Sequence, residues 1–184
     1  LQGDTLEWAL ERGRPLQRNA DTGIWRDVAT RTLAGARRLI DPVWGGMYQY
    51  SDALDWSSPH YEKIMSSQSA ALRTYSLAYG LWGDPADLDA ARAIAGYLLA
   101  FLRAPEGAFY ASQDADLNSR MDGKTYYRLG EAARRAQGLP AIDRNLYARE
   151  NGWAIAGLAA LYDQTGEAGW LAAAVQAADW VLAH

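Results

Sequence analysis

Two long stretches of the chain, residues 41–68 and 104–129, hold the side chains best suited to acid–base chemistry. The first contains His60, the only histidine away from the C-terminus, with Glu62 two residues later. An imidazole titrates near neutral pH, so His60 is a candidate general acid or base, with Glu62 as its neighbour. The second stretch supplies Asp114 as a carboxylate partner for a reaction at a scissile or epimerisable bond.

The two stretches align with each other as an internal repeat. When Gly46 is placed on Ala108, Asp52 falls on Asp114. This alignment makes Asp52 a second candidate to share acid and base roles with Asp114. It also favours Asp114 over Asp116, which we assign to ligand binding.

The same residues have a purely structural interpretation. Glu62 and Lys63 would form a salt bridge, His60 would cap a helix, and Asp114 would fasten its loop to a neighbouring turn. The sequence leaves both interpretations open.

Aromatic residues with a polar edge are abundant, since the chain has 8 Trp and 11 Tyr but only 2 Phe. Such rings pack between helices with their polar edges in water, and they also line clefts for polar ligands. Tyr48, Trp56 and Tyr110 lie in the two long stretches, so we assign them as stacking platforms for a ligand.

Side-chain amides form a second group of binding candidates. A further alignment, with Gly83 on Gly166, places Gln68 on Asn151 near the start of a helix in each case. We expect these two amides to hydrogen-bond either the hydroxyl groups of a ligand or the backbone of the long loops. Gln113 belongs to the same group of candidates.

Apolar residues recur at helical spacing in most of the remaining chain. Loop is expected at 16–24 and a short helix at 130–136. Short joints after Gly83 and at 165–167 alternate with the two long stretches, which is typical of stacked α-hairpins whose decorated loops share one face. The six main helices are predicted at 4–12, 25–40, 62–82, 85–103, 150–164 and 167–183.

Extended structure is expected only in the long stretches. Residues 47–50 have strand character, and the second stretch predicts a β-hairpin with strands at 108–112 and 124–129. Asp122 and Gly123 would form its turn.

Two motifs resemble a known family. PHYEKIM at 59–65, followed by Gln68, and FYASQDAD at 109–116 look like signatures of the thioredoxin-domain-containing family that includes spermatogenesis-associated protein 20. The resemblance covers about 41–179. It implies an (α/α) toroid of the six-hairpin glycosidase type, akin to N-acylglucosamine 2-epimerases and unsaturated glucuronyl hydrolases. It also implies a sugar-like ligand in the cavity ringed by the long loops.

The fold expected is therefore all-α, a partial (α/α)6 toroid with a small β-hairpin in a long loop, forming one domain over 1–184. The predicted helices make only about half of a six-hairpin toroid, and the CxxC motif of a thioredoxin-like domain is missing. We therefore expect a fragment or an abbreviated form, with such a domain in the full-length protein.

Two functions follow from this fold. The first is a glycoside hydrolase or sugar epimerase, and the second is a non-catalytic module that binds a ligand or docks a partner. Unmatched hairpins at the ends of a partial toroid also predict self-association, because the last helix carries an apolar stripe that includes Leu171, Val175, Ala178 and Leu182.

Composition excludes several other classes. A formal net charge of −4 with dispersed Lys and Arg argues against nucleic-acid binding, and no apolar run is long enough to span a bilayer. We expect a soluble protein and favour the cytoplasm. The segment 114–125 begins like a calcium loop but has Ser119 for the glycine and Thr125 for the closing glutamate. We therefore expect neither a metal nor a cofactor.

Overall fold

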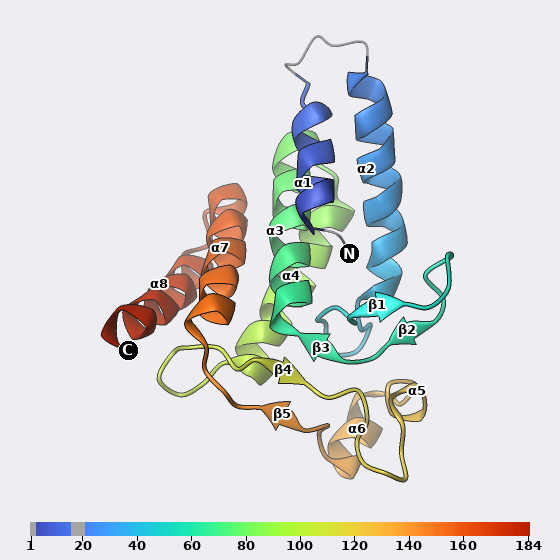
Figure 1. The fold of residues 1–184 in the computed structure, drawn as a ribbon, viewed down its shortest axis with the longest axis vertical. Helices are drawn as coiled ribbons and strands as arrows, with labels where there is room; N and C mark the ends of the chain where they lie inside the picture. Colours follow the sequence, from blue (N-terminus) through green and yellow to red (C-terminus); the bar gives the residue numbers. More distant parts are fainter. Residues whose placement is uncertain (1–2, 16–20) are drawn as a thin grey trace.

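Helices dominate the fold, as the sequence predicts. The computed structural model describes residues 3–15 and 21–184 (Figure 1). The helices in these residues are α1 (Gly3–Arg12), α2 (Thr22–Ala36), α3 (Met65–Trp82), α4 (Pro85–Tyr97), α5 (Gly123–Tyr126), α6 (Glu131–Gln137), α7 (Ala148–Thr165) and α8 (Ala168–Ala183). A 3-10 turn (Arg37–Leu39) follows α2, and a π-helical turn (Leu98–Leu102) follows α4.

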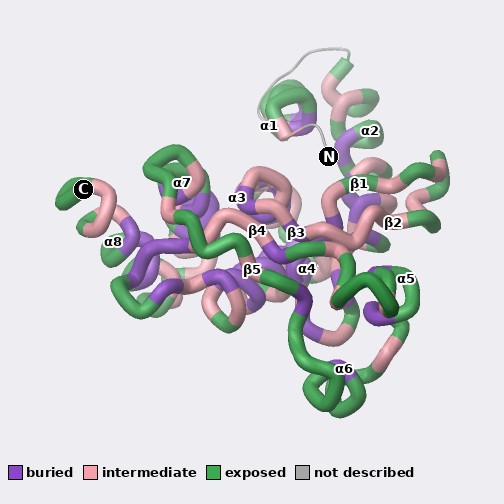
Figure 2. The backbone as a smooth tube through the Cα atoms, turned by 60° about the horizontal axis from the view of Figure 1, so that its bottom comes forward, coloured by how far each residue is buried: buried purple, intermediate pink, exposed green. Residues whose placement is uncertain are grey.

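The six longer helices pair into three antiparallel hairpins, α1–α2, α3–α4 and α7–α8. Helix α3 packs between α1 and α7, and each of these three is backed by its own hairpin partner. Figure 1 shows that α1, α3 and α7 run in the same direction and begin at the end where the long loops lie. We call them the inner helices. The core fills the space between the helices, as the buried segments in Figure 2 show.

The short joints form as predicted. Gly83 and Gly166 end α3 and α7 with φ values of 71° and 67°, a left-handed conformation that glycine adopts without a steric cost. The carboxylate of Asp84 accepts a hydrogen bond from the N–H of Ala86, and Pro85 occupies the first turn of α4. These residues reverse the chain within a few positions, so both inner helices lead directly into their partners.

Some predicted boundaries differ from the structure. Helix α2 begins at Thr22, inside the loop predicted for 16–24, of which 16–20 lie outside the described residues. Helix α3 begins at Met65 instead of residue 62, because the residues before it are extended.

The strands form two small sheets in the described part of the chain. β1 (Tyr50–Ser51) and β2 (Pro59–His60) make a small antiparallel hairpin in the first long loop. A second sheet has the order β3-β4-β5, with antiparallel neighbours. Its strands are β3 (Lys63–Ile64), β4 (Ser112–Gln113) and β5 (Ile142–Asp143). This sheet ties the second long loop to the start of α3.

The β-hairpin predicted for the second long loop is wrong. β4 pairs with β3 and β5, whereas the segment 124–129 enters no strand. Asp122 does not start a hairpin turn: its carboxylate accepts a hydrogen bond from the N–H of Thr125 and caps α5. Gly123 packs so closely on Tyr61 that a Cβ there would lie 2.9 Å from the tyrosine Cβ. The glycine is needed for this close approach.

No helix in the described residues is long and apolar enough to cross a membrane.

Candidate functional site

A hollow of about 550 Å³ lies between the β1–β2 hairpin and the segment 115–128. We call it the loop pocket. It brings together one imidazole, carboxylates and cations from segments far apart in the sequence. Its polar lining includes Asp52, Ser57, Ser58, His60, Asp116, Asp122, Lys124 and Arg128.

His60 is accessible in the loop pocket. Its side chain is 40% exposed, and its ring stacks on Tyr50 with centroids 4.8 Å apart. The imidazole Nε2 lies 3.6 Å from a carboxylate oxygen of Glu62. His60 lies in β2 and does not cap a helix. The neighbouring carboxylate is therefore in place for acid–base chemistry.

The pocket contains Asp116 and Asp52 beside His60, and Asp114 is not among its lining residues. One oxygen of Asp116 accepts a hydrogen bond from the N–H of Gly123. Asp114 is exposed outside this lining, so Asp116, which lines the pocket together with His60, is the better placed of these two aspartates.

The predicted aromatic platforms do not gather around His60. Tyr48 is buried, packs on the rings of Tyr61 and Tyr127, and has a raised pKa because of its burial. Trp56 lines a different hollow, between α1 and α2. Tyr110 is half-buried and lies under the guanidinium of Arg144.

The amides of Gln68 and Asn151 bind loop backbone. Gln68 accepts a hydrogen bond from the N–H of Met47 and donates one to its C=O. Asn151 does the same with Phe109. Both side chains are fully buried, and buried Gln113 accepts a hydrogen bond from the hydroxyl of Tyr97.

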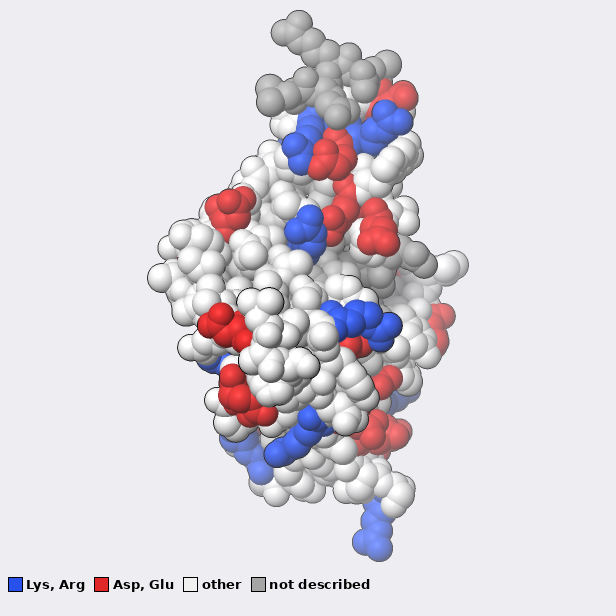
Figure 3. Space-filling view, turned by 60° about the vertical axis from the view of Figure 1, so that its left-hand side comes forward, with Lys and Arg blue, Asp and Glu red and all other residues white. Residues whose placement is uncertain are grey.

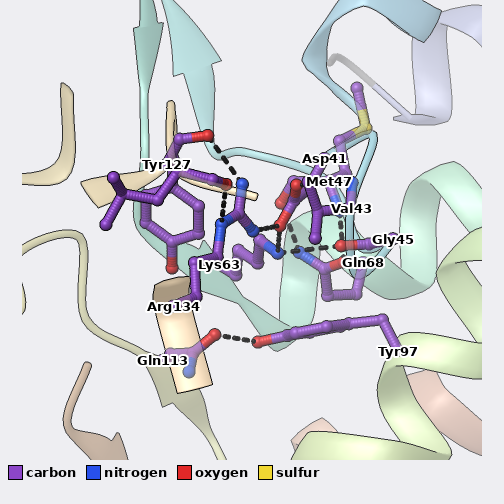
Figure 4. A network of polar contacts seen from close by, with 11 residues as sticks. Asp41, Val43, Gly45, Met47, Lys63, Gln68, Tyr97, Gln113, Tyr127 and Arg134 are labelled. Atoms are coloured by element: carbon purple, nitrogen blue, oxygen red, sulfur yellow. Dashed lines mark hydrogen bonds and ion pairs between the residues drawn. The ribbon is translucent and has the colours of Figure 1, made fainter. Parts of the chain in front are cut away.

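A buried ionic cluster that was not predicted from the sequence lies under the loops (Figure 4). The Lys63 ammonium donates to Asp41 at 2.9 Å and to the carbonyl of Gly45 at 2.8 Å. Arg134 donates to the same Asp41 oxygen at 2.6 Å and to the carbonyl of Tyr127. Lys63 therefore does not pair with Glu62, which contacts His60 instead. One available signal was the position of Lys63 directly before the apolar residues that open α3.

Aromatic rings surround this cluster and offset its excess positive charge. The Lys63 ammonium lies 4.3 Å from the ring centroid of Tyr97, and the Arg134 guanidinium lies 4.9 Å from that of Trp44. Burial lowers the pKa of Lys63 to about 8, although Asp41 partly offsets this. Burial would raise the pKa of Asp41, but the two cations outweigh it and hold that pKa below its ordinary value. The cluster therefore joins the first long loop, which contains Asp41 and Lys63, to the segment 127–134.

A second hollow, of about 590 Å³, lies on the inner helices near their first turns. We call it the inner-face pocket. It is lined by Gly3, Asp4 and Glu7 of α1, by Ser66, Ser67, Ser69, Ala70 and Arg73 of α3, and by Trp153 and Ala156 of α7.

Polar and aromatic groups both face this pocket. Arg73 forms an ion pair with Glu7 at 2.9 Å, which links α3 to α1. Trp153 is 39% exposed. The hydroxyl of Ser69 is buried without a hydrogen-bond partner in the described residues.

None of the residues that line the inner-face pocket was predicted from the sequence as a site residue. One signal was present: Ser66, Ser69 and Arg73 follow the spacing i, i+3 and i+7, which places them on one side of α3. In the same helix Leu72 and Tyr75 belong to the core. A polar stripe on a helix in the middle of a stack indicates a solvent-filled space beside it.

Figure 3 shows acidic and basic side chains scattered over one face in small groups, without a large patch of one sign. Within the described ranges, no group of three or more His, Asp or Glu side chains could hold a metal ion.

Comparison with known proteins supports the family resemblance. No family model matches the chain. Human spermatogenesis-associated protein 20 is 37% identical over 78 residues, which cover 42% of this chain and 10% of that protein. The mouse protein is 34% identical over the same length and coverage. The chain thus matches about a tenth of the length of these curated relatives.

Solved structures settle the fold. An inactive variant of the α-1,6-mannanase of Salegentibacter sp. HEL1_6, in complex with α-1,6-mannotetrose, matches 99% of this chain with a TM-score of 0.70 and 20% identity. A family 76 glycoside hydrolase from a bovine Bacteroides thetaiotaomicron strain matches 97% of it with a TM-score of 0.68 and 15% identity. This chain folds as part of an (α/α) toroid.

The chain covers less than half of each of these toroid structures. The chain covers 47% of the mannanase and 34% of the family 76 hydrolase. The unsaturated glucuronyl hydrolase from Bacillus sp. GL1 also matches, with a TM-score of 0.64, 17% identity, and coverage of 95% of this chain and 42% of the hydrolase. The inner-face pocket is lined by residues of α1, α3 and α7, one helix from each of the three hairpins.

Proposed function

We propose that this part of a toroid binds a carbohydrate at the long-loop end of its inner helices, in the inner-face pocket. The observation that carries the proposal is the position of Trp153 across the pocket from the Glu7–Arg73 ion pair. An exposed indole offers an apolar face on which a sugar ring stacks. Serine hydroxyls and the ion pair offer donors and acceptors for sugar hydroxyls.

The fold likeness supports this ligand class. Several proteins with the same fold are glycoside hydrolases, and the mannanase is in complex with an α-1,6-linked oligosaccharide. Glu7 is engaged by Arg73, an arrangement suited to holding hydroxyl groups rather than to transferring protons. We therefore infer binding as the function of the inner-face pocket.

Binding to a glycan array, followed by calorimetry with α-1,6-mannotetraose and the best array ligands, tests the proposal. We expect Trp153→Ala to weaken binding at least 10-fold. Trp8→Ala is the matched control, because Trp8 is similarly exposed but outside the pocket. If no saccharide binds, or if Trp153→Ala binds as the parent does, the proposal fails and a partner-docking module is the better interpretation.

Acid–base turnover at the loop pocket is a second candidate function, favoured by the accessible His60 beside Glu62. In this proposal His60 acts as acid or base, and Asp116 or Asp52 provides the carboxylate partner. Hydrolysis or epimerisation of any saccharide bound by the chain would be followed by NMR. We expect His60→Gln to abolish it while leaving binding at Trp153 unchanged. Undiminished turnover in His60→Gln would remove the histidine from the mechanism.

A further inference from the structure

Ser69 differs from the other buried hydroxyl residues of α3. A serine or threonine inside a helix often donates its hydroxyl hydrogen to the carbonyl four residues earlier. Thr74 does this with Ala70 at 2.6 Å, and Ser76 with Leu72 at 2.7 Å. These three side chains belong to residues that are at most 4% exposed. The Ser69 hydroxyl, however, forms no hydrogen bond with any residue that the structure describes, and such a group costs free energy until something binds it.

Ser69 lines the inner-face pocket where α3 packs closely on α7. A Cβ on Gly157 of α7 would lie 3.4 Å from the Ser69 carbonyl oxygen and 3.0 Å from a methyl carbon of Leu72. Trp153 lies one turn before Gly157 on α7 and lines the same pocket. Ser69 is therefore on the Trp153 side of the inner-face pocket.

The backbone that carries Ser69 is held from several sides. Ser69 belongs to the second turn of α3, a helix of 18 residues that packs on α1, α4 and α7. Its neighbour Gln68 is fully buried and binds the backbone of Met47. On the other side, a Cβ on Gly3 of α1 would lie 3.0 Å from the Cβ of Ala70. A polar group on such a rigid support can select one orientation of a ligand.

The charges around the pocket favour an uncharged ligand. Its charged lining residues are Asp4, Glu7 and Arg73, which leave one negative charge in excess. Arg73 is already paired with Glu7 at 2.9 Å. A carboxylate or sulfate group on a ligand would therefore meet excess negative charge in a partly enclosed space, which is unfavourable. A sugar hydroxyl carries no such penalty.

We propose that Ser69 determines the specificity of the inner-face pocket by hydrogen-bonding one hydroxyl of an uncharged saccharide whose ring stacks on Trp153. This inference rests on the carbohydrate binding proposed above. A serine hydroxyl both donates and accepts, and it changes direction by rotation about χ1, so the bond forms without movement of the backbone. The pocket then selects a sugar with a hydroxyl at this position over the sugar that lacks it.

Calorimetry with monodeoxy sugars tests the proposal. The probes are α-1,6-mannotetraose, or the uncharged saccharide that binds best in the glycan array, and its analogues that each lack one hydroxyl. We expect one analogue to bind the parent chain about 10-fold more weakly than the intact saccharide. Ser69→Ala should bind the intact saccharide about 10-fold more weakly, and it should no longer distinguish the intact saccharide from that analogue.

Ser76→Ala is the matched control. Ser76 is a fully buried serine of the same helix, but its hydroxyl binds the carbonyl of Leu72 and it does not line the pocket. This variant should bind every probe as the parent chain does. Thermal unfolding gives a readout that is independent of binding. Ser69→Ala should melt no lower than the parent chain, because it removes an unsatisfied hydroxyl and alanine favours the helix.

Several results would overturn the proposal while leaving the proposed carbohydrate binding in place, provided that Trp153→Ala still weakens binding. Ser69→Ala would bind the intact saccharide as the parent chain does, or would still reject the same analogue. A sharply lowered melting temperature of Ser69→Ala would show that the hydroxyl supports the fold. Tightest binding of uronic-acid or sulfated saccharides would contradict the uncharged ligand class. Absence of binding to any saccharide would instead contradict the proposed function, and this inference with it.

Discussion

Gln68 holds the backbone of Met47 by both its N–H and its C=O, at 2.7 and 2.5 Å. Asn151 holds Phe109 in the same way, at 2.7 and 3.1 Å. Each amide projects from the first turns of an inner helix onto the loop that leads into it. The repeat aligned in the sequence therefore corresponds to a repeated pair of hydrogen bonds between a side-chain amide and the loop backbone. Gln68 makes this pair in the first copy and Asn151 in the second.

Removing the two hydrogen bonds between Gln68 and Met47 should destabilise the fold. Gln68→Leu keeps much of the volume but leaves the buried N–H and C=O of Met47 without partners. Because each of these two unsatisfied buried groups costs about 1–3 kcal/mol, we expect a loss of about 2–6 kcal/mol in urea unfolding. Gln137→Leu, at an exposed amide in α6, is the control. A loss below about 0.5 kcal/mol would contradict the role of Gln68.

The Asp41 carboxylate should matter more than either of its cationic partners. Asp41→Asn leaves Lys63 and Arg134 buried without a counter-charge, and breaking a buried pair in this way typically costs about 3–5 kcal/mol. Lys63→Met removes one of the two cations that share the Asp41 carboxylate and fills similar space. It should therefore reduce the free energy of unfolding clearly less. Chemical denaturation of both variants checks this order, and equal losses would argue against it.

The stability of the protein should rise with pH between about 8 and 10. The pKa of Lys63 is about 8 in the folded protein, whereas a lysine exposed in the unfolded chain has its ordinary pKa of 10.5, so the unfolded chain binds more protons in this window. Unfolding free energy therefore increases as the pH rises through it. Lys63→Met should flatten this part of the profile. A profile that is unchanged by Lys63→Met would show that the titrating group lies elsewhere.

Gly35 should resist substitution because of Trp56. A Cβ at residue 35 would lie 2.4 Å from the indole Nε1 of Trp56, whose backbone already has a φ of 65°. We expect Gly35→Ala to cost about 1–3 kcal/mol and to shift the tryptophan fluorescence as the hairpin tip moves. Gly23→Ala, with nothing within 4 Å of its new Cβ, is the control. Adding Trp56→Ala should recover part of the loss.

Replacement of the predicted catalytic pair should leave the fold intact. His60 is partly exposed and Asp114 is exposed. We therefore expect His60→Gln and Asp114→Asn to change stability by no more than about 0.5 kcal/mol. Thermal unfolding of each variant measures this. A sharply lowered melting temperature in either variant would make that residue a structural fastener.

The architecture was predictable because it rests on local signals. Gly83 and Gly166 mark the joints by backbone preference alone, and the apolar spacing of α3, α4, α7 and α8 follows from burial on one side of a helix. The β-hairpin was wrongly predicted because Asp122 and Gly123 fit a turn as well as a helix start. Contact with Tyr61, which is distant in sequence, decides between them.

The site was harder to predict because it depends on contacts between distant segments. Lys63 lies next to Glu62 in sequence but binds Asp41, 22 residues away, and Arg134 reaches the same carboxylate from 93 residues away. Trp153 and Arg73 look like ordinary helix residues until α3 and α7 are set side by side. His60 and Asp116 were chosen from their residue types and both line the loop pocket, whereas Asp114, the carboxylate favoured from the sequence, does not.

The small sheet β3-β4-β5 also bears on the order of folding. Each strand has two residues, and the three come from segments near 63, 112 and 142. So few hydrogen bonds cannot offset the entropy of closing such long loops until the helices have brought the segments together. The sheet should therefore form after the rate-limiting step. Substitutions in it would then accelerate unfolding and leave the folding rate nearly unchanged, giving φ-values near zero in this sheet.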